Sequence, residues 1–182
     1  MKKTGIALLF LVLGLTLPSN AEIYLYVDSD GVIQPDKKRK APPNQNIANR
    51  KHTYPIMYDA YIQAASGKYG VTFALIKAII KTESDFNPRA ISPKGALGLM
   101  QLMPENVKRL EIQDPFAPAE NIMGGTRHFK SLSDHFAGDL SLALASYNAG
   151  IKPVERCQCI PPFRETRDYV KKVLNHYEEI KK

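Results

Sequence analysis

One short segment, residues 72–84, constrains the fold because it places a carboxylate on the side of a helix that should face the protein interior. Ile76, Ile79 and Ile80 precede Glu83 by seven, four and three residues. A helical period of 3.6 residues therefore puts all four side chains on one face. A packed helical domain can accommodate this pattern if the acid lies at the edge of its core.

Such a position would give the acid unusual chemistry. Lys77, Lys81 and Ser84 are expected on the opposite face, towards solvent. Burial among aliphatic groups disfavours the ionised carboxylate, and the negative end of the helix dipole acts in the same direction. We therefore expect Glu83 to keep its proton near neutral pH, as a general acid must. Periodicity alone favours an ordinary solvated glutamate, and the residues that follow it reverse that interpretation.

The segment after Glu83 has the composition of a binding loop. It reads SDFNPRA and then ISPKGALGLMQLMP. Pro88 disfavours helical geometry at Asn87, so the helix should end just past the acid. Small residues at 95–98 let the backbone approach another group closely, and Gln101 offers an amide donor and acceptor. The loop therefore indicates a surface that binds something polar and uncharged.

Four segments, in this order, resemble the soluble lytic transglycosylases, whose lysozyme-like SLT domain cuts the glycan strands of peptidoglycan. They are residues 83–104, the sequence NIMGG at 121–125, ALASYNAG at 143–150 and PPFRETRDYV at 161–170. The resemblance covers about residues 55 to 180. Four motifs in the right order form a specific signal.

The resemblance implies a reaction, with Glu83 as the catalytic residue. The substrate would be the β-1,4 bond between N-acetylmuramic acid and N-acetylglucosamine. One glutamate would protonate the leaving oxygen and then deprotonate the muramoyl 6-hydroxyl, which attacks within the same sugar and forms a 1,6-anhydromuramoyl end. Attack by a group already held in the substrate removes much of the entropic cost, so the second carboxylate of ordinary glycosidases is not required.

The resemblance also implies substrate-binding residues around a cleft. They are Ser92, Gly98, Gln101 and Met103 on one wall, Asn121, Tyr147 and Asn148 on the other, and Glu165 nearby. Glu165 would either hold Tyr147 or orient the substrate. A plain core role is the alternative for Tyr147, because aromatic residues at helical spacing usually pack inside, but its place in the motif favours the binding role.

Other acidic residues have structural interpretations. Asp85 lies two residues beyond Glu83, which turns it by about 200° around the helix and away from the acid. Asp114 is expected in a turn, and Asp139 as the N-cap of a helix that Gly150 ends.

The fold class predicted from these patterns is mainly α. It is a lysozyme-like helical domain with a substrate cleft, preceded by a short β-hairpin-like N-terminal segment. Helices are predicted at residues 55–69, 72–84, 104–110, 119–136, 140–148 and 166–180, with no strong strand after residue 54. Residues 22–27 are rich in strand formers, and residues 28–31 form a turn signal.

The predicted organisation has four parts. They are a signal peptide at residues 1–21, a short β segment at 22–34, a linker at 35–54 and the transglycosylase domain at 55–182. Met1, Lys2 and Lys3 precede an apolar run that ends near small residues, which predicts cleavage after Ala21. The run is too short to span a bilayer comfortably. We expect export to the periplasm or cell envelope, with no stable membrane span afterwards.

The positive charge suits a wall substrate. The formal charge is +7, and loss of Lys2 and Lys3 would lower it to +5. A basic exported protein is attracted to acidic wall polymers, so peptidoglycan glycan strands are the expected partner. The run KKRK at 37–40 lies in the predicted linker, and we interpret it as a solvated connector rather than a nucleic-acid site. We expect a monomer. A partner in cell-envelope machinery remains open, as does the choice between general wall turnover and service to a secretion system, pilus or flagellum.

The cysteines and histidines imply no cofactor and no metal. Cys157 and Cys159 are separated by one residue, which strains a disulfide and does not fit the usual zinc pairs. A local bridge, pairing with a partner and free thiols all stay open. The four histidines form no ligand pattern: His52, His128, His135 and His176.

Two other functions are compatible with the sequence. One is a hydrolase on the same substrate, as in the goose-type lysozymes, which would leave reducing ends. The other is a non-catalytic wall-binding or assembly protein, against which the complete motif around Glu83 argues.

Overall fold

The computed structural model describes residues 25–27, 33–35 and 54–182. Contacts divide the chain into two units, Met1–Lys51 and His52–Lys182. In the first unit, strands β1 (Leu25–Val27) and β2 (Ile33–Pro35) pair antiparallel, as the sequence predicted. The predicted signal peptide, the turn at 28–31 and the basic run at 37–40 lie outside the described residues.

The second unit is built from helices, which confirms the predicted fold class. They are α1 (Asp59–Tyr69), α2 (Phe73–Ser84), α3 (Pro104–Arg109), α4 (Pro118–His135), α5 (Leu140–Ala149), α6 (Ile151–Cys157) and α7 (Arg164–Ile180). Within the described ranges, none of the helices combines the length and apolar character that a membrane crossing needs.

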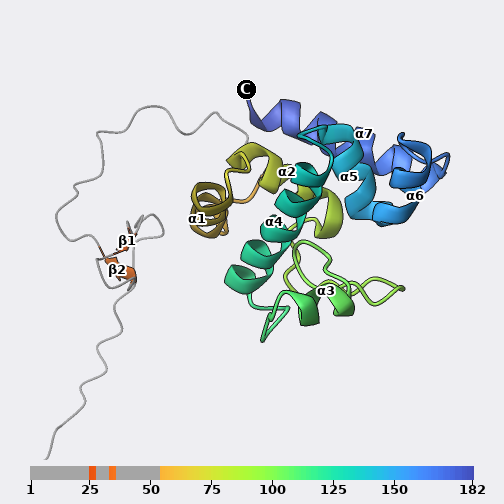
Figure 1. Ribbon diagram of the computed structural model, residues 1–182. Helices are drawn as coiled ribbons and strands as arrows, with labels where there is room; N and C mark the ends of the chain where they lie inside the picture. The colour runs from red at the N-terminus through yellow and green to blue at the C-terminus, as the bar shows by residue number, and fades with distance from the viewer. Residues whose placement is uncertain (1–24, 28–32, 36–53) are drawn as a thin grey trace, which may run out of the picture. The chain divides into compact units, whose positions relative to one another are not determined.

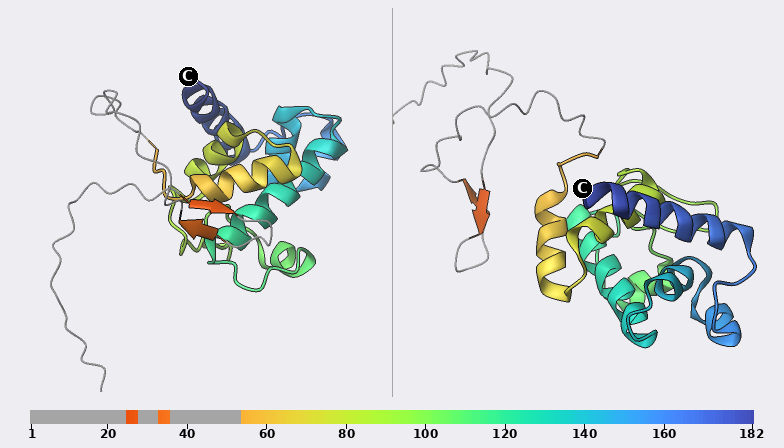
Figure 2. Two further views of the ribbon diagram at one scale, coloured as in Figure 1. Left: turned by 90° about the vertical axis from the view of Figure 1, so that its left-hand side faces the viewer. Right: turned by 90° about the horizontal axis from the view of Figure 1, so that it is seen from above.

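Half of the residues of helix α2 are buried. It runs along α7 and also touches α1, while α4 packs against α1 and α5, and α5 contacts α6 and α7 (Figure 1). The right-hand view of Figure 2 shows α1 and α4 side by side. Their shared core contains side chains with no exposed surface, including Ile62, Ile76, Ile79, Leu144 and Val173. Glu83 therefore lies at the end of a helix that packs against both α1 and α7.

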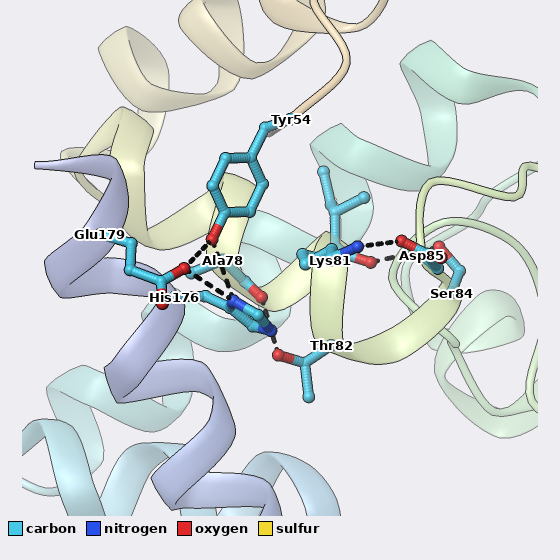
Figure 3. Close-up of polar contacts among 9 residues, drawn as sticks. Tyr54, Ala78, Lys81, Thr82, Ser84, Asp85, His176 and Glu179 are labelled. Carbon is cyan, nitrogen blue, oxygen red and sulfur yellow. Dashed lines mark hydrogen bonds and ion pairs between the residues drawn. The ribbon is translucent and has the colours of Figure 1, made fainter. Parts of the chain in front are cut away.

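The end of α2 is set by backbone geometry rather than by proline. Asp85 and Phe86 take left-handed conformations with φ of 50° and 63°, so the helix ends at Ser84. The Asp85 carboxylate turns back to Lys81, whose Nζ lies 2.5 Å from Oδ1 (Figure 3). Pro88, the predicted stop, comes only after this turn. The sequence located the helix end correctly but not its cause.

The prediction for Lys77 was wrong, because this side chain is buried rather than exposed. Its Nζ donates a hydrogen bond to Asp59 Oδ1 at 2.6 Å and lies 5.2 Å from the centre of the Phe73 ring. A buried ammonium group is strongly unfavourable unless a carboxylate compensates it. Periodicity within α2 contains no information about the carboxylate that α1 supplies. Helix α2 is consequently enclosed on its second side as well.

Helix α6 was not predicted. It contains Pro153, which lies in the first turn, where the backbone N–H groups have no acceptor within the helix. Cys157 at the end of α6 is bonded to Cys159, with Gln158 between them in a left-handed conformation. Of the three states that the sequence left open, the structure has the local bridge.

The beginning of the helical unit is tied to the end of the chain. The Tyr54 hydroxyl donates to the Glu179 carboxylate at 2.5 Å and lies 3.0 Å from His176 Nδ1, as Figure 3 shows. Burial, and then the nearby Glu179, raise the pKa of Tyr54, so the phenol keeps its proton. This clasp holds the last turns of α7, whose first turns carry residues of the cleft described next.

Candidate active site

An elongated cleft runs along one side of the helical unit. Its smaller part has a volume of about 360 Å³ and is lined by residues that include Thr82, Glu83 and Tyr169. Its larger part, of about 740 Å³, is lined by residues from α3, α4, α5 and α7. Asn148 and Glu165 line both parts, so the two hollows adjoin.

Glu83 lies in the wall of the smaller hollow, where the last turn of α2 brings it. Burial raises the pKa of Glu83 to about 7, and the negative charge of Glu165 acts in the same direction. The phenol of Tyr169 opposes this shift and lowers the pKa. The side chain still reaches the hollow, since it is only half-buried. A carboxyl group with this pKa is present in both protonation states near neutral pH, which agrees with the direction expected from the sequence.

Two tyrosines flank this acid. Burial, and then the charge of Glu83, raise the pKa of both Tyr147 and Tyr169 well above the ordinary value, so both phenols stay protonated. The Tyr147 hydroxyl donates to the Met100 carbonyl at 2.8 Å. The Tyr169 hydroxyl is buried and makes no hydrogen bond of regular geometry among the described residues. Its interaction with Glu83 is therefore imperfect in this state and can tighten when the carboxyl ionises.

Asn121, which was predicted to bind substrate, lies inside the domain. It has no exposed surface. Its Oδ1 accepts a hydrogen bond from the Met100 amide at 2.7 Å, and its Nδ2 donates to the carbonyls of Leu97 at 3.0 Å and Pro115 at 2.7 Å. These bonds join α4 to the loop after α2, so the amide holds the loop in place.

Three more of the predicted binding residues belong to that loop. Gln101 Nε2 donates to the carbonyls of Ala90 at 3.1 Å and Gly98 at 2.8 Å. Ser92 Oγ accepts from the backbone amide four residues further on. Gly98 has a φ of 74°, and a Cβ there would lie 2.3 Å from the Pro115 carbonyl oxygen. None of the three lines either hollow.

The remaining predicted residues meet at the cleft. Met103 and Tyr147 line the larger hollow, and Asn148 and Glu165 line both. Asn148 Oδ1 accepts from the Thr166 hydroxyl at 2.8 Å. Glu165 makes an exposed ion pair with Lys94 at 3.2 Å and does not hold Tyr147, whose hydroxyl is bonded to the loop.

The acidic residues that were given structural roles have them. Asp114 accepts from the Phe116 amide at 2.8 Å within a turn. Asp139 caps α5 by accepting from the Leu142 amide at 3.0 Å. Asp85 is exposed and paired with Lys81, as described above.

Several residues of the cleft were missed by sequence reasoning. Tyr169 stands in the fourth motif, at 161–170, which is the signal that could have identified it. Asp168 lines the smaller hollow. Arg109 and His128 line the larger one, and their partnership spans 19 residues, so no local pattern reveals it.

Comparisons with known proteins agree with this geometry. Residues 60–170 match the family model described as the Transglycosylase SLT domain. A transglycosylase of Enterobacteria phage PRD1 is 40% identical over 89 residues, which cover 49% of this chain and 33% of the phage protein. The soluble lytic murein transglycosylase of Salmonella typhimurium (strain LT2) is 34% identical over 146 residues, covering 66% of this chain and 22% of the relative.

A solved structure shares the fold. It is an inactive variant of lytic transglycosylase Slt from Pseudomonas aeruginosa in which glutamine replaces a glutamate. It aligns with a TM-score of 0.63 and 31% identity, over 70% of this chain and 24% of that protein. The chain thus spans a third or less of the length of each of these three proteins. Because the family match covers well over half of the chain and contains all four sequence motifs, the chain belongs to the transglycosylase SLT domain family.

Proposed function

We propose that this protein is a peptidoglycan lytic transglycosylase that cleaves the β-1,4 bond between N-acetylmuramic acid and N-acetylglucosamine. One observation carries the proposal: a glutamic acid whose pKa is raised to about 7 stands in the wall of an elongated cleft. The names of relatives, which include soluble lytic murein transglycosylase, support the same substrate.

In the first step, Glu83 acts as a general acid. Its protonated carboxyl donates to the glycosidic oxygen while the bond from that oxygen to the anomeric carbon of the muramoyl residue breaks. The carboxylate that remains is stabilised by Tyr169, whose interaction favours the ionised form, and destabilised by Glu165. Burial, opposed by Tyr169 and assisted by Glu165, brings the pKa close to the pH at which the proton must be both given and recovered.

In the second step, the same carboxylate acts as a base. The muramoyl 6-hydroxyl attacks the anomeric carbon and forms the 1,6-anhydro bond, while its proton passes to Glu83. The glutamic acid is thereby regenerated, and no water is consumed. Attack within one sugar can reach effective molarities on the order of 10⁵ M, so a single carboxyl group suffices.

A hydrolase is the second candidate, because Glu165 and Asp168 also line the smaller hollow. One of them would activate a water molecule in place of the 6-hydroxyl. Both are well exposed and paired with cations, Glu165 with Lys94 at 3.2 Å and Asp168 with Arg164 at 3.7 Å. Exposure and pairing are more typical of residues that orient a substrate than of a general base.

Analysis of the products separates the two candidates. Purified sacculi are digested with the native protein, Glu83→Gln, Glu165→Gln and Asp168→Asn, and the fragments are identified by mass spectrometry. We expect 1,6-anhydromuramoyl ends from the native protein and from the Glu165 and Asp168 variants, and no product from Glu83→Gln. Reducing ends alone would favour the hydrolase. Full activity of Glu83→Gln would remove Glu83 from the mechanism.

The proposal extends to the location of the protein. We propose that residues 1–21 direct export and that the mature protein acts in the cell envelope as a monomer. Sequencing of the mature N-terminus should identify Glu22 as its first residue. An uncleaved N-terminus in an exporting host would contradict the assignment.

A further inference from the structure

The larger part of the cleft contains a cationic group that the proposed chemistry does not use. Arg109, at the end of α3, donates from Nη2 to Asn106 Oδ1 at 3.1 Å and to His128 Nδ1 at 3.0 Å. Asn106 belongs to the same helix and His128 to α4. The guanidinium is therefore anchored from two helices, at the surface of the hollow that all three residues line.

The charge of Arg109 is not neutralised by its anchors. Asn106 has no charge, and burial, followed by the nearby Arg109, lowers the pKa of His128 to about 4, so the imidazole is neutral at physiological pH. Among the residues that the structure describes, no carboxylate lies within ion-pair distance of Arg109, although Glu105 lines the same hollow. Lys94, the other cation of this lining, is paired with Glu165. Of the cationic side chains that line this hollow in the described part of the chain, Arg109 is thus the one without a paired carboxylate.

The guanidinium keeps donors for such a ligand. Arginine has five N–H donors, and both contacts described above use Nη2. Nη1 and Nε remain, and each can donate a single charge-assisted hydrogen bond to a carboxylate, because both two-donor edges of the guanidinium include Nη2. The pairing with a neutral histidine orients these donors without reducing their charge.

A second feature of this hollow is a buried hydroxyl group without a hydrogen-bond partner among the described residues. Ser146 contributes to the lining of this hollow, and only 1% of its surface is exposed. Within the described part of the chain, its Oγ has no hydrogen-bond partner. Buried hydroxyl groups are normally bonded, so this Oγ, which has almost no exposed surface of its own, leaves an unsatisfied polar group in the wall of the hollow.

We propose that the larger hollow receives the peptide stem of the substrate and that Arg109 binds one of its carboxylates. The stem branches from the muramoyl residue, so this assignment rests on the proposed function. It makes Arg109 a specificity residue that distinguishes glycan carrying peptides from bare glycan. A neutral acetamido group of a sugar would not need the positive charge.

The test compares two soluble substrates. One is uncrosslinked glycan strands with intact peptide stems, and the other is the same strands after an amidase has removed the stems. Initial rates are measured on both for the native protein, Arg109→Gln, Arg109→Lys and Lys108→Gln. Lys108 is the matched control, because it is a neighbouring exposed cation on α3 that does not line the hollow.

The expected result is a selective loss. Arg109→Gln should raise KM roughly tenfold or more on peptide-bearing strands, as expected for loss of a charge-assisted hydrogen bond, and leave the rate on stripped strands unchanged. Arg109→Lys should retain part of the preference for peptide-bearing strands, since lysine keeps the positive charge but not the fixed donor positions of the guanidinium. Lys108→Gln should match the native protein on both substrates.

Two other results would overturn the inference. Equal losses on both substrates would assign Arg109 to the sugar backbone, and an unchanged preference would leave it without a role in binding. Each of these outcomes requires the native protein to cleave the strands, so they reject the stem assignment alone. A native protein that cleaves neither substrate would instead reject the proposed function, and this inference with it.

Discussion

Two neighbouring regions differ in how fully their polar side chains are hydrogen-bonded. At the end of α2, the Glu83 carboxyl is half-buried, and its neighbours leave its pKa at about 7. In the loop that follows, the amide of Gln101 hydrogen-bonds to backbone atoms, and the amide of Asn121 on α4 does the same from outside the loop, at distances of 2.7–3.1 Å. The comparison teaches that the carboxyl group with few hydrogen bonds is suited to chemistry, whereas the fully hydrogen-bonded amides are suited to holding the loop in place.

The largest expected effect is on the reactive side of this comparison. Glu83→Gln should lower turnover by roughly 10³-fold, because the proposed mechanism assigns both the acid and the base function to this one group. The measurement is the rate of release of soluble muropeptides from sacculi. Glu178→Gln is the control. Glu178 is exposed near the end of α7, so this change should leave the rate unchanged.

The same variant should become more stable than the native protein at alkaline pH. The pKa of Glu83 is about 7 in the folded state and has an ordinary value of 4.5. The contribution of its proton to stability is complete below pH 4.5 and is lost as the pH rises through 7. Ionisation therefore costs up to about 3 kcal/mol at pH 8, and glutamine removes this cost. Denaturant unfolding should give equal stabilities at pH 4. A difference of the same size at both pH values would contradict the assignment.

The supporting side should respond in stability first. Asn121→Ala leaves the Met100 amide and the Pro115 carbonyl without partners inside the protein and removes one of two hydrogen bonds to the Leu97 carbonyl, which should cost roughly 3 to 4 kcal/mol in the free energy of unfolding. Asn175→Ala is the control, since this asparagine is exposed on α7 and should change stability by less than about 0.5 kcal/mol. Urea unfolding of both variants measures the difference. Similar values for the two would mean that the Asn121 bonds do not hold the loop.

A pair of glycines tests how tightly the loop is packed. Gly95 and Gly98 both have positive φ, 84° and 74°. A Cβ on Gly95 would meet nothing within 4 Å, whereas one on Gly98 would lie 2.3 Å from Asn121 Nδ2 and from the Pro115 carbonyl. Gly95→Ala should cost about 1 kcal/mol for backbone strain, and Gly98→Ala about 1 to 3 kcal/mol more for the overlap. Equal losses in thermal unfolding would show that the loop can move away.

The smallest effects are shifts in the pH dependence of turnover. Activity that needs protonated Glu83 falls as the pH rises through its pKa. Tyr169→Phe removes the interaction that lowers this pKa, so the alkaline limb should move to higher pH. Glu165→Gln removes a charge that raises it, so the limb should move to lower pH. Each shift should be below about one pH unit. Shifts in the same direction would contradict the arrangement around Glu83.

Much of the fold could be predicted because local periodicity reflects the packing of helices. The segment predicted as a helix at 119–136 corresponds to α4 (Pro118–His135), and that at 72–84 to α2 (Phe73–Ser84). The errors occur where a distant residue decides. Lys77, for example, is buried because Asp59 of another helix neutralises it.

The candidate site could be predicted only in part, for a related reason. The motifs identify which residues belong together, but not which of them face the cleft. Asn121 hydrogen-bonds to a residue 21 positions away, and Arg109 meets His128 across 19. The direction of a side chain depends on such partners, so Glu83 and Tyr147 could be anticipated while the supporting role of Asn121 could not.

The clasp between Tyr54 and the last turns of α7 has a mechanical consequence. A force applied to the backbone at Tyr54 would act on Glu179 and His176 through the hydrogen-bonded phenol. Helix α7 also presents Glu165 and Tyr169 to the cleft. A force on Tyr54 would therefore act on the same helix that carries these two residues of the cleft.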